Sequence, residues 1–323
     1  MHMVEFDVHL TKDSRVVVFH DGDLERMCVG AGNKNRSLHV NDVNYEDLPM
    51  LKLPSEVWAE TEAEDTKTRE GGKEKEKKEK TKGGGNDDLS DPHPRQRIPL
   101  LTDVLSSLPA TTCMTVEIKA HAHDDARTRD LVARTDTILK AHARAHDVAG
   151  RVIWFSLQAH ANNTLLPACN PARPRITSAR NATLFILAHW CGLLPFLPTS
   201  WISGGAACCG IVNPSSITVG LLRRVPGCSA TPTWFLERLR PVLRPILASP
   251  SMVSHLRKRG MAVYMLGVND AAALALASRC GVDAVLTDRP RWLAASAGLG
   301  RRGRSSDDEK QQEMQTIVRK KER

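Results

Sequence analysis

Two apolar runs near the start of the chain predict a β-hairpin. Residues 4–10 and 16–19 are rich in β-branched side chains and enclose a short polar turn, which is the pattern of a strand, a turn and a second strand. Residues two apart on a strand point to the same face, so Glu5 and Asp7 project together. His20 follows the second run, where aspartate and glycine indicate a loop. One predicted strand therefore presents two carboxylates, and the next ends in an imidazole.

Strand-like and helix-like segments alternate through the rest of the chain. Further strands are predicted at 114–119, 152–157, 207–214 (a strand and its loop) and 261–269, with 282–290 closing the pattern. Helices are predicted at 98–109, 124–146, 250–259 and 270–280. Asp270 is expected to cap the last helix, and Gly260 to end the one before it in a left-handed conformation. This alternation predicts an α/β protein with a parallel sheet.

The strand at 114–119 adds two charged side chains to the candidate chemistry. Glu117 and Lys119 alternate onto one of its faces. Two neighbouring carboxylates such as Glu5 and Asp7 repel each other unless a cation or a proton lies between them. From spacing alone, however, such pairs are also common on the solvent face of a surface strand. The residues by themselves therefore leave a binding site and a plain surface both open.

Two segments have a composition that does not support a packed core. Residues 60–96 are almost free of apolar side chains and are expected to form a disordered insertion. Residues 298–323 form a charged tail that is also expected to be disordered. We therefore expect one domain over 1–297, interrupted by the insertion.

The most apolar stretch of the chain is residues 183–198, which contain one histidine and two prolines. About 20 apolar residues are needed to span a bilayer, so this stretch is too short. Trp190 and Trp201 are suited to a lipid interface, which predicts peripheral membrane contact through 183–201. A buried helix with a hydrophobic loop is the alternative.

Composition narrows the class of protein. The chain has 323 residues, 41% of them hydrophobic, with a net charge of +8, which is enough for one large domain. It lacks the helix-turn-helix, zinc-finger and RNA-recognition patterns, so we expect no nucleic-acid partner. The eight cysteines include no C-x-x-C pair, which favours reduced thiols and an intracellular protein. No apolar leader precedes the first predicted strand.

Residues 5–13 and 16–21 together resemble the central signature of the glycerophosphodiester phosphodiesterase family, E-x-D-v-x-x-T-k-D followed by an apolar run and H-D. The strand at 114–119 resembles the family's n-i-E-i-K strand, and 282–290 resembles its G-V-D-x-i-x-T-D-x-P end. The resemblance implies a (β/α)8 barrel of the phosphodiesterase type. The family's His-Arg-Gly and Glu-Asn-Thr turns have no counterpart here, so we expect the first β/α unit to be lacking. Leu266 stands where the family has tryptophan.

The resemblance also implies roles for the selected residues. Glu5, Asp7 and Glu117 match the family's metal ligands, and carboxylate oxygens suit Mg²⁺ or Ca²⁺. Lys119 would contact the phosphoryl group. His20 matches one of the family's two catalytic histidines and would act as a general acid or base. The other histidine belongs to the missing turn, so we predict weak activity for this chain.

The expected function is metal-dependent hydrolysis of glycerophosphodiesters or lysophospholipids, as in the membrane-associated, lysophospholipase D-like branch of the family. Its products would be an alcohol and either glycerol 3-phosphate or lysophosphatidic acid. One alternative is a catalytically inactive barrel that binds lipid or acts as a scaffold. Another is a sphingomyelinase D-like enzyme, although the resemblance at 11–13 and 287–290 favours the phosphodiesterase branch.

Overall fold

A computed structural model of the chain shows two compact units, Met1–Pro174 and Arg175–Arg323, which we describe separately. The residues that the structure describes are 3–33, 36–53, 56–57, 96–109, 111–121, 124–146, 151–213 and 248–296. The predicted insertion at 60–96 lies almost entirely outside them, and the predicted tail at 298–323 lies wholly outside them. That 1–297 form one domain, and that a first β/α unit is lacking, stay predictions.

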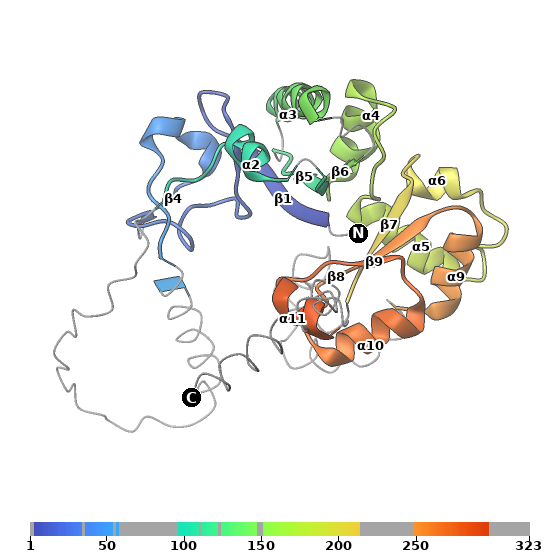
Figure 1. The fold of residues 1–323 in the computed structure, drawn as a ribbon. Coiled ribbons are helices and arrows are strands. Elements are labelled where there is room, and N and C mark those ends of the chain that lie inside the picture. Colours follow the sequence, from blue (N-terminus) through green and yellow to red (C-terminus); the bar gives the residue numbers. More distant parts are fainter. Residues whose placement is uncertain are drawn as a thin grey trace, which may run out of the picture. The chain divides into compact units, whose positions relative to one another are not determined.

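The first unit is built on a four-stranded sheet in the order β2–β1–β5–β6, of which β1, β5 and β6 are labelled in Figure 1. The strands are β1 Met3–Leu10, β2 Val16–Val18, β5 Cys113–Ile118 and β6 Val152–Phe155. β1 and β2 pair antiparallel, whereas β1, β5 and β6 run parallel. The sequence predictions for these four strands are confirmed to within one or two residues at each end.

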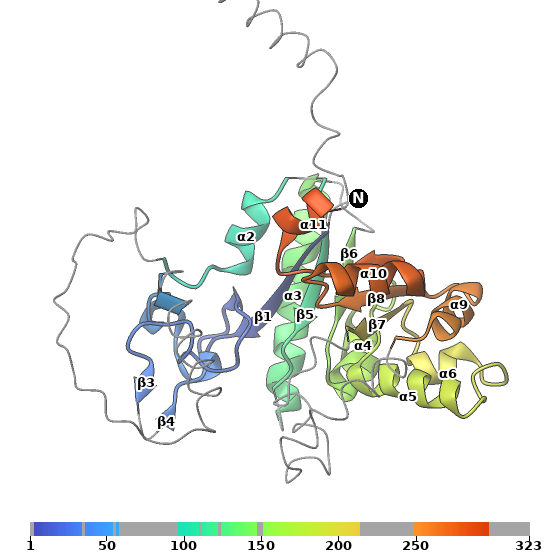
Figure 2. The ribbon, with the colours of Figure 1, turned by 90° about the horizontal axis from the view of Figure 1, so that it is seen from below.

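One face of this sheet carries the core of the unit. Apolar side chains of the strands pack against α2 (Leu101–Ser107), α3 (Asp125–His146) and α4 (Leu166–Cys169), and Figure 2 shows α3 lying along the strands. The buried cluster includes Phe6, Val8, Leu10, Met114, Val116, Ile118, Leu131, Leu139, Trp154 and Leu166. Because side chains alternate along a strand, the odd-numbered positions of β1 and β5 face the other way.

A long connection joins β2 to α2 and has a small apolar core of its own. Its described elements are β3 Gly32–Asn33, β4 Arg36–Ser37, η1 Val40–Asp42 and η2 Tyr45–Asp47. The core side chains include Val17, Phe19, Leu24, Cys28, Val40, Leu48 and Ile98. The Leu51 N–H donates a hydrogen bond of 2.8 Å to the carbonyl of Gln96. The two ends of the segment between these residues are therefore held side by side.

The second unit holds a parallel three-stranded sheet in the order β7–β8–β9. The strands are β7 Cys208–Val212, β8 Ala262–Leu266 and β9 Ala284–Val285. The helices in its described residues are α5 Ala179–Trp190, α6 Thr199–Ser203, α9 Pro250–Lys258, α10 Ala271–Cys280 and α11 Pro290–Ser296. Two predicted boundaries are confirmed. Asp270 accepts a hydrogen bond of 2.8 Å from the Ala273 N–H, and Gly260 has a φ of 79°.

Several short helical segments are missing from the sequence predictions, among them η3 (Ala161–Leu165), which is a π-helix, and α4, α6 and α11. η3, α4 and α6 have five residues or fewer, which are too few positions to show a helical period. Proline lies in the first turn of both α4 and α11, where its fixed φ is compatible with a helix although it usually signals a break.

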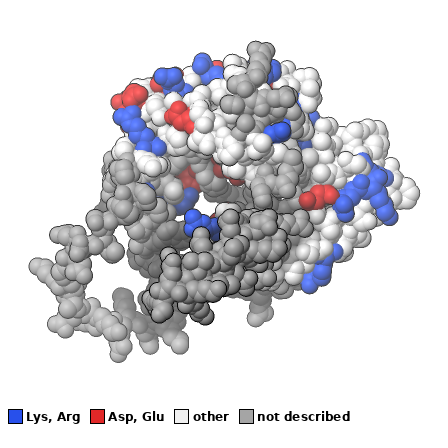
Figure 3. Space-filling view, in the orientation of Figure 1, with Lys and Arg blue, Asp and Glu red and all other residues white. Residues whose placement is uncertain are grey.

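Charges of both signs lie on the described surface. On the face in Figure 3, lysines and arginines are scattered among acidic and uncharged side chains rather than gathered in one field. The net charge of +8 therefore does not produce a single basic patch on the described residues of this face.

A candidate metal and phosphate site

Three carboxylates meet on the face of the first sheet opposite its core. β1 and β5 are parallel neighbours, and their register places Asp7 beside Glu117 and Glu5 beside Thr115. Ligand oxygens of Glu5, Asp7 and Glu117 all lie within 4.8 Å of one another. Asp7 and Glu117 are buried, and Glu5 is half-buried. The structure thus brings together the three residues that the sequence analysis selected as metal ligands.

Lys119, directly after β5, lies against two of these carboxylates. Its Nζ is 2.8 Å from Asp7 Oδ1 and 3.0 Å from Glu117 Oε1. Burial alone lowers the pKa of Lys119, but the charges of Glu117 and Asp7 outweigh it and raise that pKa on balance. Burial, together with the charge of Asp7, raises the pKa of Glu117 in spite of the lysine. Lys119 is therefore charged and held inside the cluster.

The donor set of this cluster fits a divalent cation. All three side chains offer carboxylate oxygens, which are the ligands that Mg²⁺ and Ca²⁺ prefer. With every group ionised, one ammonium against three carboxylates leaves an excess of two negative charges. Buried charges are costly unless they are paired, and the raised pKa of Glu117 reflects that cost. A bound divalent cation would balance the excess.

His20 lies next to this cluster but is not one of its ligand-forming groups. It follows Phe19, whose N–H donates a hydrogen bond of 3.0 Å to the carbonyl of Asp7. The His20 side chain is 72% exposed, and its Nδ1 is 2.7 Å from Asp21 Oδ1. The hydrogen bond to Asp21 raises the pKa of His20, and the charge of Asp7 adds to this effect. His20 is therefore an accessible imidazole within electrostatic reach of the carboxylates.

Sequence reasoning missed a second histidine at this site. His9 is buried and occupies the same face of β1 as Glu5 and Asp7. Burial lowers its pKa to about 4, so the ring is neutral at physiological pH. Its Nε2 is buried and has no hydrogen-bond partner among the described residues. The alternation that selected Glu5 and Asp7 extends one step further to His9, so the signal was present.

The Thr-Lys-Asp part of the signature has a structural role in the β1–β2 turn. Thr11 Oγ1 donates a hydrogen bond of 2.6 Å to Asp13 Oδ1 and accepts one of 2.9 Å from the Arg15 N–H. Asp13 also accepts a hydrogen bond of 2.9 Å from the Tyr45 N–H. Ser14 has a φ of 64°, which a tight turn requires here. These residues hold the hairpin that places Asp7 and His20 near each other.

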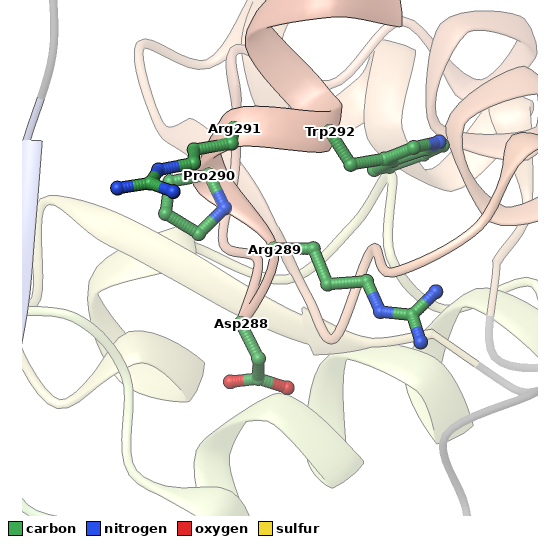
Figure 4. A pocket seen from close by; sticks show the side chains of 5 residues that line it. All are labelled: Asp288, Arg289, Pro290, Arg291 and Trp292. Atoms are coloured by element: carbon green, nitrogen blue, oxygen red, sulfur yellow. The ribbon is translucent and has the colours of Figure 1, made fainter. Parts of the chain in front are cut away.

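The Thr-Asp-Arg-Pro motif, in the second unit, is also held by its neighbours. Asn269 Nδ2 donates a hydrogen bond of 2.7 Å to Asp288 Oδ2, and Asn269 Oδ1 accepts from the Thr287 hydroxyl at 3.0 Å. A pocket opens at this motif, and Figure 4 shows its acidic and basic side chains pointing in different directions. The pocket is lined by Asp288, Arg289, Pro290, Arg291 and Trp292. The motif thus orders the loop after β9.

The apolar stretch forms most of α5 and the turn that follows it. Among the described helices, none has the length and apolar character needed to cross a bilayer. Phe185 and Leu194 are buried, as a core helix requires. Large apolar side chains nevertheless remain exposed along the stretch and on α6 after it, namely Leu184, Leu187, Trp190, Leu193, Phe196 and Trp201.

Comparison with known proteins supports the resemblance. The sequence profile of the glycerophosphoryl diester phosphodiesterase family matches residues 1–193. Lysophospholipase D GDPD1 of Mus musculus is 26% identical over 298 residues, covering 90% of this chain and 75% of the relative. Lysophospholipase D GDPD3 of Homo sapiens is 25% identical over 291 residues, covering 90% and 74%.

Solved structures share the fold at lower identity. A glycerophosphodiester phosphodiesterase from Agrobacterium tumefaciens has a TM-score of 0.50 at 16% identity, covering 90% of this chain and 85% of that one. An Oleispira antarctica phosphodiesterase in complex with the product sn-glycerol 3-phosphate has a TM-score of 0.53 at 18% identity, covering 92% and 85%. Because these enzymes are (β/α)8 barrels, the predicted fold class is confirmed.

Proposed function

The chain belongs to the glycerophosphoryl diester phosphodiesterase family, and from this premise we propose that it hydrolyses lysophospholipids and glycerophosphodiesters with a divalent metal. Membership of the family makes it a phosphoric diester hydrolase. The choice of lysophospholipids as substrates is supported by the relatives, which are lysophospholipases D. The observation that carries the proposal is the carboxylate cluster with Lys119 inside it.

In the proposed reaction, water attacks the phosphorus atom and the ester bond to the head-group alcohol breaks. Lysophosphatidic acid leaves when the substrate is a lysophospholipid, and glycerol 3-phosphate leaves when it is a glycerophosphodiester. Mg²⁺ or Ca²⁺ held by Glu5, Asp7 and Glu117 would supply electrostatic stabilisation of the phosphoryl oxygens.

The protein side chains supply the remaining functions. Lys119, with its raised pKa, carries a fixed positive charge beside the phosphoryl position. His20 is exposed, and its pKa is raised above that of an ordinary histidine. It is therefore suited to donate a proton to the departing alkoxide oxygen.

Turnover by the purified chain tests this proposal. We expect release of glycerol 3-phosphate from glycerophosphocholine, or of lysophosphatidic acid from lysophosphatidylcholine, with Mg²⁺ or Ca²⁺ and not with EDTA. His20→Asn should lower kcat by about 10²- to 10⁴-fold, and Glu117→Gln should weaken metal binding. Asp23→Asn, a change of one charge in the same loop outside the cluster, is the control. A turnover rate that is unchanged by EDTA and by Glu117→Gln would refute the metal site. Metal binding without any turnover would favour the lipid-binding alternative.

We also propose that the chain meets its substrate at a lipid surface, through 183–201. Of the ten large apolar side chains that are exposed in the described residues, six lie between Leu184 and Trp201. Exposed apolar patches of this kind mark interaction sites, and tryptophan favours the lipid interface. Residues 175–213 contain no aspartate or glutamate, so this segment itself presents no carboxylate side chain to anionic head groups.

Arg259 fixes the most exposed part of this surface. Its guanidinium donates hydrogen bonds of 2.6 Å to the carbonyls of Leu197 and Pro195. Phe196, between them, is 81% exposed, and Trp201 is 77% exposed. Phe196 is thus displayed on a braced loop, and Trp201 is exposed on the helix α6 that follows it.

Sedimentation with vesicles of phosphatidylcholine and phosphatidylserine tests this contact. The Phe196→Ala/Trp201→Ala double variant should lower the vesicle partition coefficient by more than about tenfold, because each lost aromatic contact is worth about 1.5–3 kcal/mol when fully buried. Met50→Ala, at an exposed apolar side chain outside this surface, is the control. Equal binding by both variants would refute the proposed contact without affecting hydrolysis of the soluble glycerophosphocholine.

A further inference from the structure

The loop after β2 holds a chain of three ionisable side chains that ends at His20. His20 Nδ1 lies 2.7 Å from Asp21 Oδ1. Arg26 Nε donates to Asp21 Oδ2 at 2.7 Å, and Arg26 Nη2 donates to Asp21 Oδ1 at 2.9 Å. The guanidinium therefore grips both oxygens of the carboxylate, which is the strongest geometry for this kind of pair. Asp21 Oδ1 is shared between the arginine and the histidine.

The backbone around Arg26 is fixed on both sides. The Leu24 N–H donates to the carbonyl of Leu38, and the Cys28 N–H donates to the carbonyl of Leu24, both at 2.9 Å. The side chains of Leu24 and Cys28 are fully buried in the small core of this loop. Arg26 thus stands on an anchored turn, whereas His20, with a side chain that is 72% exposed, has little packing to orient it.

The chemistry of the pair determines which ring nitrogen faces outward. An ionised carboxylate accepts hydrogen bonds and does not donate them. Hydrogen bonds from His20 and Arg26 hold the pKa of Asp21 well below its ordinary value, although burial acts against them. Asp21 is therefore ionised, and its oxygen accepts the proton of His20 Nδ1. The other nitrogen, Nε2, is the one left for proton transfer.

We propose that Asp21 and Arg26 are positioning residues for His20 in the reaction proposed above. Arg26 fixes the plane of the Asp21 carboxylate, and Asp21 fixes the orientation and tautomer of the imidazole. Neither residue needs to touch the substrate. This inference rests on the proposed function for its kinetic consequences, but the geometry of the three side chains stands without it.

An NMR titration of His20 in the full chain tests whether Asp21 acts on the imidazole, and it requires no turnover. The Cε1–H signal is assigned by comparison with His20→Asn. Asp21→Asn should move its midpoint to lower pH by about 0.5–1 unit, because the carboxylate that favours the charged ring is lost. Asp23→Asn, two residues away, should leave the midpoint in place. An unchanged midpoint in Asp21→Asn would overturn the proposal.

Kinetics test whether Asp21 and Arg26 support catalysis through His20. Asp21→Asn and Arg26→Gln should lower kcat by about 10- to 100-fold with little change in KM, which is less than the loss in His20→Asn. Arg26→Lys should recover only part of the activity, since an ammonium cannot grip both oxygens. If the Arg26 variants raise KM and leave kcat intact, Arg26 binds substrate directly and the positioning role is wrong. If the wild-type chain itself lacks turnover, the proposed function fails, while the titration still decides the link between Asp21 and His20.

Discussion

Replacing Lys119 with methionine is the sharpest test of the charge balance in the carboxylate cluster. The variant keeps most of the side-chain volume but leaves Asp7 and Glu117 without the ammonium that lies 2.8 and 3.0 Å from them. The three side chains are 18%, 8% and 10% exposed, so solvent screens them little. Removing one partner of such a buried pair costs about 3–5 kcal/mol.

Chemical denaturation in EDTA measures this loss. Lys140→Met is a matched control, because Lys140 lies 2.6 Å from the buried Asp136 but is itself 51% exposed. A pair with one exposed partner should contribute about 0–1 kcal/mol. The expected result is a free energy of unfolding that falls several times further in Lys119→Met than in Lys140→Met.

Two further conditions follow from the same reasoning. A divalent cation at about 100 times its dissociation constant should restore about 2.7 kcal/mol to the Lys119→Met variant. The deficit should also shrink from about pH 8 to about pH 5, because Glu117, whose pKa is raised, binds a proton in the folded state before it does so in the unfolded chain. Equal losses in the two lysine variants, with no response to Mg²⁺ or Ca²⁺, would refute the argument.

Three other predictions concern stability and reactivity. Hydrogen bonds and nearby cations hold the pKa of Asp136 below its ordinary value against the effect of burial. The resulting stability is present above about pH 4 and is lost as the pH falls further. Asp136→Asn should therefore make the free energy of unfolding depend less on pH in the acid range. Asp13→Asn should lower the free energy of unfolding by about 1–2 kcal/mol in a denaturant titration, because it weakens the β1–β2 turn; an unchanged midpoint would remove that turn role. Iodoacetamide should modify the exposed Cys191 well before Cys209, since burial raises the pKa of Cys209 to about 12, and mass spectrometry of the peptides should show this order.

Most of what could be predicted about the site from the sequence came from the alternation of side chains along β1. It put Glu5 and Asp7 on one face, and the structure places them there. Pairing β1 with β5 is a different matter, because about a hundred residues separate them and no local pattern states which strands are neighbours. The resemblance to the family grouped Glu117 with Glu5 and Asp7 as metal ligands, whereas the pairing of β1 with β5 and the register of Asp7 beside Glu117 come from the structure.

The contacts around His20 lay beyond sequence reasoning. Arg26 reaches Asp21 because the turn between them is folded onto a small apolar core, and such a path depends on many loop dihedrals at once. His9 is a different case, since its position on β1 was readable and its burial was not. Burial is a property of the packed chain, so a polar residue on a predicted strand face cannot be assigned to solvent or to a site from its spacing.

The hydrogen bond between Leu51 and Gln96 has a practical consequence for work on this protein. Leu51 and Gln96 are neighbours in the fold. The number of residues between them can therefore change with little effect on the sheet. Closure entropy depends only weakly on the length of a connection, at about 0.6 kcal/mol for each doubling. A reporter domain or an affinity tag inserted between these two residues is therefore expected to leave the described sheet in place.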